Sequence, residues 1–299
     1  MSRVGHQDIR IGTLAKMEGC EDYLPQILGH GFESFQLTNW AKLAEGQDTV
    51  AGQKEQAARV LELLGDQAII SSIGIYGNPM TDEVTRVAWE TLIQSAGAWG
   101  ATTVCGFTGC LPETAVDKTM DRFGEVFGPL TKMAEDHGVK IGFENCDMGG
   151  NWDKPNWNIA HAPRAWEMMF NTVVSDHIGL EWEPCHQMVS LVDPLPNLRK
   201  WVGKVVHIHG KDATVDWEKV KREGIRCGEY IVHHRTPGFG DTNWRDVISI
   251  LRMNGWTGSI DIEGWHDPVY RDELEMTGQV HGLNYLKWCR GGEFVENPS

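Results

Sequence analysis

Three observations predict that residues 1–299 form a single (β/α)8 barrel. Eight short apolar runs alternate with eight segments that carry apolar residues at helical spacing, and this alternation is typical of parallel α/β proteins. Several of the apolar runs end in ionisable residues, as strands do at the carboxyl edge of a parallel sheet. The doubly wound open sheet is the alternative. The nucleotide-binding versions of that sheet are disfavoured because no run is followed by G-x-G-x-x-G and no Walker A pattern occurs.

The first half of the chain supplies four strand–helix pairs. An apolar run at 9–12 precedes a helix at 22–29, and the alternating run at 32–37 precedes a helix at 50–64 that ends at Gly65. The third strand is expected at 68–73, before a helix within 81–99. The fourth is expected at 102–107, before a helix at 116–137 that ends at Gly138.

The second half repeats this order with two longer connections. Strands are expected at 139–143, 177–182, 205–208 and 259–262, and helices are expected to begin near Pro163 and to cover 195–202, 244–254 and 272–288. A loop at 147–158 is rich in Gly, Asn and Trp. An insertion of mixed charge at 213–235 follows the seventh strand, and the C-terminal tail at 291–299 is expected to fray.

Composition excludes several classes of function. The formal net charge of −15 works against binding a nucleic acid, which requires a basic surface. No apolar run is long enough to span a membrane, and the first ten residues have no signal-peptide core. The seven cysteines form no CxxC pair, so we interpret them as reduced thiols of a cytoplasmic protein.

Four consecutive predicted strands end in a residue that can bind a metal ion: Glu144, Glu183, His209 and Glu263. Parallel strands of a barrel end at one rim, so these four side chains are expected to converge. Three carboxylates and one imidazole form a hard site that suits Mn²⁺ best, with Mg²⁺, Co²⁺ and Zn²⁺ as alternatives. An acidic residue at one strand end often serves only to cap the next helix, but four such residues together favour a metal site.

The motifs resemble those of a known family. Phe143-Glu144-Asn145, Glu183-x-x-His186, His209-x-Lys211-Asp212, Arg235-x-Pro237-Gly238-x-Gly240-Asp241 and Ile262-Glu263 are similar to the sugar phosphate isomerase/epimerase family, which shares the xylose isomerase-like TIM barrel with the ketose 3-epimerases. The resemblance covers nearly the whole chain. It implies that Glu144, Glu183, His209 and Glu263 hold one divalent metal ion. It also implies that Glu144 and Glu263 act as the acid/base pair and that His186 and Arg235 hold substrate oxygens.

The chain also departs from that family. Glu183 stands where ketose 3-epimerases usually have Asp, the insertion with His233 and His234 is longer, and the loop with Trp152 and Trp157 is bulkier. Among weaker candidates, Lys211 is expected either to pair with Asp212 or to bind substrate. Trp265, like Trp40, Trp152 and Trp157 in the other rim loops, is expected to stack on a sugar ring. Glu181 and His207 are expected to point into the barrel below the metal site, as hydrogen-bonded groups or as a second metal position.

The leading hypothesis is a metal-dependent isomerase or epimerase that acts on a small carbohydrate, a ketose or a related sugar, through an enediolate. One alternative is a lyase or hydrolase that cleaves an oxidised (3-keto) glycoside by β-elimination, because the same enediolate can expel a leaving group. A second alternative is a sugar-binding barrel without catalysis. An apurinic endonuclease is disfavoured by the net charge, and self-association into a homo-oligomer is left open.

Overall fold

The computed structural model describes residue 6 and residues 8–298, and within that part of the chain eight parallel strands close into a barrel. Around the barrel the strands follow the order β1-β10-β7-β6-β5-β4-β3-β2. Their bounds are β1 (Ile9–Lys16), β2 (Ser34–Trp40), β3 (Ile69–Tyr76), β4 (Thr103–Gly106), β5 (Lys140–Glu144), β6 (Ile178–Trp182), β7 (Val205–Gly210) and β10 (Gly258–Ile262). The predicted fold class is therefore confirmed, and each predicted strand overlaps an observed one.

Helices connect the strands, as the alternating pattern predicts. Their bounds are α1 (Cys20–Leu28), α2 (Val50–Leu64), α3 (Glu83–Ser95), α4 (Met120–His137), α5 (Pro163–Thr172), α6 (Pro184–Val189), α7 (Pro194–Trp201), α8 (Trp217–Glu223), α9 (Trp244–Met253) and α10 (Glu275–Cys289). Local signals account for several of these bounds. The Asp82 side chain accepts hydrogen bonds from the backbone N–H groups of Val84 and Thr85 at the start of α3. Gly138, with a left-handed φ of 66°, ends α4.

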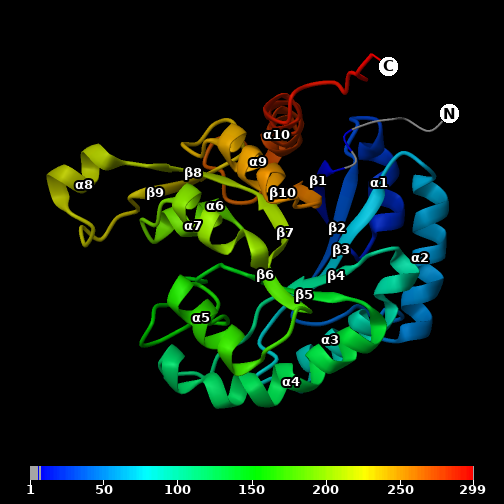
Figure 1. Cartoon of the computed structure of the whole chain (residues 1–299), viewed down its shortest axis with the longest axis horizontal. Helices are drawn as coiled ribbons and strands as arrows, with labels where there is room; N and C mark the ends of the chain where they lie inside the picture. Colours follow the sequence, from blue (N-terminus) through cyan, green and yellow to red (C-terminus); the bar gives the residue numbers. More distant parts are fainter. Residues whose placement is uncertain (1–5, 7, 299) are drawn as a thin grey trace. The chain divides into compact units, whose positions relative to one another are not determined.

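The internal contacts divide the described chain into two compact units. Unit 1 holds residue 6 and residues 8–13, 183–203 and 209–298, and unit 2 holds residues 14–182 and 204–208. In unit 2, α2, α3 and α4 lie side by side along the outside of the strands, as Figure 1 shows. The grouping of all 299 residues into one domain stays a prediction.

Each unit has packing contacts of its own. In unit 2, Phe127 packs against Phe143 of β5 and Trp89 of α3, with ring centroids 4.9 Å and 5.8 Å apart. In unit 1, β1 pairs with β10 in parallel register from Ile9↔Gly258 to Thr13↔Ile262. Burial of such side chains is the main favourable contribution to folding. No helix within the described residues is long and apolar enough to cross a membrane.

The insertion predicted at 213–235 has secondary structure of its own. Strand β8 (Asp212–Val215) pairs antiparallel with β9 (Val232–Arg235), and α8 lies between them at the far end of the hairpin (Figure 1). The register places Ala213 opposite His234 and Asp212 opposite Arg235. The hairpin therefore brings His234 and Arg235 back to the carboxyl end of β7.

Candidate functional site

Three of the four predicted metal ligands meet in unit 1. Glu183 directly follows β6, His209 lies in β7 and Glu263 directly follows β10. The His209 Nδ1 atom lies 3.2 Å from Glu183 Oε2 and 3.2 Å from Glu263 Oε2. One ligand atom from each residue lies within 4.8 Å of the others, and all three side chains are buried. This spacing is that of atoms arranged around a common centre.

These residues fit a hard divalent cation. Among the described residues, the buried Glu263 Oε2 atom accepts no hydrogen bond. A buried carboxylate oxygen without a hydrogen-bond partner is costly, and a cation would compensate its charge. The donor set of carboxylate oxygens and one imidazole nitrogen is suited to Mn²⁺ or Mg²⁺ and lacks the thiolates that are typical of structural zinc sites.

Lys211 lies beside this cluster. Its side chain is buried, and its Nζ atom lies 2.6 Å from Glu263 Oε1 and 3.9 Å from Glu183 Oε1. Burial alone would lower the pKa of Lys211, but the two carboxylates outweigh burial and raise it, so the ammonium stays charged. Lys211 thus pairs with Glu263 and not with Asp212. The Asp212 carboxylate instead accepts hydrogen bonds from the backbone N–H of Thr242 and from Trp244 Nε1.

The two acidic residues have opposite pKa shifts. Burial raises the pKa of Glu183, and the charge of Glu263 acts in the same direction. Burial would also raise the pKa of Glu263, but Lys211 and His209 outweigh it and hold this pKa well below its usual range. The ammonium of Lys211 therefore favours the charged form of Glu263. Carboxylates with pKa values moved apart are a common feature of acid/base sites.

Histidines form one side of the cluster. The His186 Nε2 atom, at the start of α6, lies 3.2 Å from Glu183 Oε1. The His186 ring packs against His234 with centroids 5.5 Å apart, and His234 packs against His266 at 5.7 Å. Burial, together with the charges of Lys211 and His186, lowers the pKa of His234 to about 3, so His234 is neutral. No role for His234 could be predicted from the sequence, because the hairpin fold brings His234 beside His186, and His266 joins them through its contact with His234.

Arg235 and Trp265, both predicted to bind substrate, also lie in unit 1. Arg235 Nε donates to Asp267 Oδ2 at 3.3 Å, and Asp267 also accepts hydrogen bonds from the backbone N–H groups of Thr236, Val269 and Tyr270. Asp267 therefore fixes the position of Arg235. Trp265 lies two residues after Glu263 and is 43% exposed, which leaves its ring accessible to a ligand. Contact of Arg235 and Trp265 with substrate stays a prediction.

Glu144, the fourth predicted ligand, is the last residue of β5 in unit 2. It is buried, and the parallel register places it opposite Glu181 of β6, two residues before Glu183. Asn158 Nδ2 donates to the backbone carbonyl oxygens of Glu144 and Cys146, both at 2.8 Å, and so fixes the strand end. That Glu144 completes the ligand set stays a prediction.

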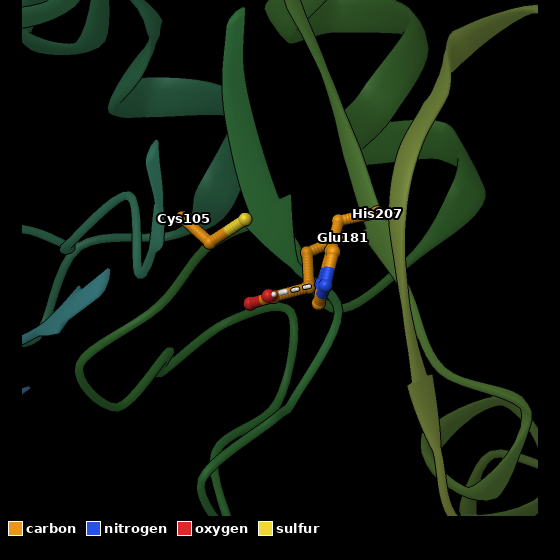
Figure 2. Close-up of side chains that lie close together, drawn as sticks. All are labelled: Cys105, Glu181 and His207. Atoms are coloured by element: carbon orange, nitrogen blue, oxygen red, sulfur yellow. Dashed lines mark hydrogen bonds and ion pairs between the residues drawn. The ribbon is translucent and has the colours of Figure 1, made fainter. Parts of the chain in front are cut away.

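A second buried cluster lies in unit 2. Figure 2 shows Cys105 of β4, Glu181 of β6 and His207 of β7, with a hydrogen bond between His207 Nδ1 and Glu181 Oε1 of 2.9 Å. Glu181 also accepts hydrogen bonds from Gln36 Nε2 and from the Tyr76 hydroxyl at 2.8 Å. With three donors on one carboxylate, this cluster is a hydrogen-bonded interior network, which was one of the two expectations for Glu181 and His207.

The comparisons with known proteins agree with this architecture. A family model described as "Xylose isomerase-like TIM barrel" matches residues 25–287, so the chain belongs to that family. The inosose dehydratase of Clostridium perfringens (strain ATCC 13124) is 33% identical over 170 residues, which are 54% of this chain and 52% of that protein. The chain thus spans about half the length of this curated relative.

Solved structures share the fold. Mannonate dehydratase from Streptococcus suis serotype 2 superposes with a TM-score of 0.71 at 14% identity, covering 94% of each chain. D-psicose 3-epimerase superposes with a TM-score of 0.67 at 14% identity, covering 95% of this chain and all of that one. At such identities the likeness concerns the fold alone, and the reaction must be argued from the residues of the site.

Proposed function

We propose that this protein is a divalent-metal-dependent enzyme that removes the proton beside the carbonyl group of a small polyhydroxylated substrate and returns it as an isomerase or epimerase. The observation that carries the proposal is the buried cluster of Glu183, His209 and Glu263, with the Lys211 ammonium 2.6 Å from Glu263. We propose Glu144 as the fourth ligand, because it ends β5 and its register partner Glu181 lies two residues before Glu183.

The ion bound by these residues would supply positive charge beside the substrate's carbonyl and hydroxyl oxygens and so stabilise the enediolate. Mn²⁺ is our first choice, since the donor set is mostly oxygen. Glu263 acts as the base. The hydrogen bond from Lys211 fixes one Glu263 oxygen, so that the other faces the cluster. Glu144 would return the proton to the substrate.

The surrounding residues hold the substrate in this proposal. His186 is fixed by its contact with Glu183, and Arg235 is fixed by Asp267, so each presents hydrogen-bond donors without a large loss of side-chain entropy. Trp265 offers an exposed ring to the carbon–hydrogen face of a sugar. The small carbohydrate substrate, a cytoplasmic location and any self-association are parts of the proposal that follow from the sequence analysis.

Elimination of water is the second candidate reaction. It is favoured by the sequence relatives, since the C. perfringens relative that matches half of this chain is an inosose dehydratase. The same enediolate forms, the bond between the β-carbon and its oxygen breaks, and the departing hydroxyl takes a proton to leave as water. We assign donation of this proton to His186, whose Nε2 atom lies 3.2 Å from Glu183 Oε1.

One experiment tests the proposal and separates its two forms. The protein, loaded with Mn²⁺, is incubated in D₂O with ketohexoses, inososes and 3-keto-glucosides, and the products are followed by NMR and mass spectrometry. An isomerase or epimerase incorporates deuterium and conserves the substrate's atoms, whereas elimination yields a product lacking one water or the aglycone. If no substrate exchanges a proton or reacts, whereas saturable sugar binding is retained, the protein is a sugar-binding barrel and the proposed chemistry is wrong.

A further inference from the structure

The hairpin formed by β8 and β9 in unit 1 has a packed base and an unpacked tip. At the base, Ala213 and Val232 form one buried apolar cluster with Cys185 and Met188 of α6. At the tip, no residue of α8 is buried, and Figure 1 shows α8 at the end of the hairpin, away from α6 and α7. We call residues 216–230, which include α8, the arm.

The arm exposes apolar surface. Three of its large apolar side chains are more than half exposed: Trp217 (52%), Ile225 (61%) and Tyr230 (84%). The backbone N–H of Asp216 donates to the carbonyl oxygen of Ile231 at 2.8 Å, which continues the antiparallel register of β8 and β9 by one position. Trp217 and Tyr230 follow at the next position on each side of the hairpin. Grouped exposed aromatic residues are typical of surfaces that bind another protein.

The arm is held in shape by contacts of its own. The Asp216 side chain accepts a hydrogen bond from the backbone N–H of Lys219 at 2.8 Å and caps α8. Lys219 Nζ pairs with the Glu229 carboxylate and joins α8 to the segment that returns to β9. The arm therefore presents Trp217 and Tyr230 in a fixed arrangement, which lowers the entropic cost of binding a partner.

The charges of the arm differ from those of the remaining chain. The arm contains four acidic and four basic residues, so its net charge is zero and the remaining chain carries the whole formal charge of −15. Two copies of an acidic chain repel each other, except where they meet through a neutral surface. Glu218 lies near the start of α8 and Arg222 near its end, and both side chains are exposed. In an antiparallel pair of α8 helices, Glu218 of each copy therefore lies beside Arg222 of the other.

We propose that the arm binds the arm of a second copy of this chain about a twofold axis, so that the protein is a homodimer. Such an interface uses the same surface of both copies and must be self-complementary. Apolar packing of Trp217 and Tyr230 forms its centre, and the reciprocal pairs of Glu218 with Arg222 form its rim. A neutral arm has no net attraction to the acidic remainder of a second copy, which favours contact between the two arms.

The first test measures the mass of the full chain by sedimentation velocity over a range of protein concentrations. We expect the wild type to sediment at about twice the chain mass of 33.5 kDa. Trp217→Ser/Tyr230→Ser should raise the dissociation constant of the dimer at least about 100-fold. The matched control is Trp288→Ser on α10, which removes an equally accessible indole (60% exposed) and should leave the dimer unchanged. Circular dichroism checks that each variant is folded.

Charge reversal tests the contact between the two arms. At low ionic strength, Arg222→Glu and Glu218→Lys should each weaken the dimer, because each places like charges opposite one another. An equimolar mixture of the two variants should restore opposite charges and form a heterodimer, which native mass spectrometry resolves by mass.

Three outcomes overturn the proposal. The first is a wild type that is monomeric at every concentration. The second is a dimer that Trp217→Ser/Tyr230→Ser leaves intact. The third is a Glu218→Lys protein that dimerises more tightly by itself than the wild type does, because a basic arm would then bind the acidic remainder of the second copy. Since these experiments follow mass and not turnover, failure of the proposed chemistry would not affect their result.

Discussion

The Lys211 ammonium lies 2.6 Å from the Glu263 carboxylate, and both groups are buried at the end of neighbouring barrel strands. A buried ion pair of this kind is rarely retained for stability alone, because desolvation offsets most of the attraction. The pair instead fixes one Glu263 oxygen and favours the charged form of Glu263. In the proposed function this prepares Glu263 to accept a proton.

Replacing Glu263 with glutamine should reduce turnover by about 10²–10⁴-fold, because the amide cannot accept the substrate proton. The circular dichroism spectrum should stay that of the wild type. The matched control is Glu229→Gln in the hairpin, where the carboxylate is exposed and pairs with Lys219. A fully active Glu263→Gln protein would remove Glu263 from the mechanism.

Replacing Lys211 with methionine should lower the free energy of unfolding by about 3–5 kcal/mol, because Glu263 is left as a buried, uncompensated charge. The double variant Lys211→Met/Glu263→Gln should recover much of that loss, since neither partner then carries a charge. Chemical denaturation of the metal-free proteins measures both effects. If the double variant were as unstable as Lys211→Met, the loss would come from packing and not from charge.

Asp267 should make stability depend on pH in the acid range. Burial would raise the pKa of Asp267, but hydrogen bonds from three backbone N–H groups and the charge of Arg235 outweigh it and lower the pKa. A carboxylate with a lowered folded-state pKa stabilises the fold above its unfolded value of about 3.9, and this contribution is lost as the pH falls through the folded-state pKa. Asp267→Asn should therefore be less stable than the wild type at pH 7, with the difference shrinking below about pH 4. If the difference in stability between Asp267→Asn and the wild type stayed constant from pH 7 to pH 3, the lowered pKa of Asp267 would be contradicted.

The interior network around Glu181 should be sensitive to the loss of one donor. Tyr76→Phe removes the hydroxyl that donates to Glu181 Oε2 at 2.8 Å and should cost about 1–3 kcal/mol of stability. Tyr230→Phe is the control, because Tyr230 is 84% exposed and its hydroxyl should contribute little. Thermal unfolding of both variants checks the expectation. If Tyr76→Phe melted at the same temperature as Tyr230→Phe, the other hydrogen-bond donors to Glu181 would compensate for the lost hydroxyl.

Much of the fold could be predicted because its signals are local. The β-branched run at Val205–Gly210 and the glycine that ends α4 each act through neighbouring residues, and the observed elements agree with the predicted ones. The ends of strands can likewise be recognised in the sequence. This is why Glu183, His209 and Glu263 could be predicted as metal ligands. Helix α6 was missed because it has only six residues and follows a strand end directly.

The features that could not be predicted from the sequence depend on contacts between residues that are distant along the chain. The partner of Lys211 is 52 residues away, so its adjacent neighbour Asp212 was the natural but incorrect expectation. His234 reaches His186 because the hairpin folds back along β8, and nothing in a charged insertion specifies that register. The stacking of Trp40 on Trp157 depends on a left-handed conformation that tryptophan disfavours in isolation.

The most direct test of the central claim is the metal content of the purified protein. Plasma mass spectrometry is applied to the wild type, His209→Ala and His233→Ala, each stripped with EDTA, reloaded with Mn²⁺ and desalted. His209 lies 3.2 Å from both Glu183 and Glu263, whereas His233 is exposed on the hairpin. We predict about one Mn²⁺ per chain in the wild type and in His233→Ala, and a large loss in His209→Ala. Equal metal content in all three proteins, or none in the wild type, would contradict the proposed metal site.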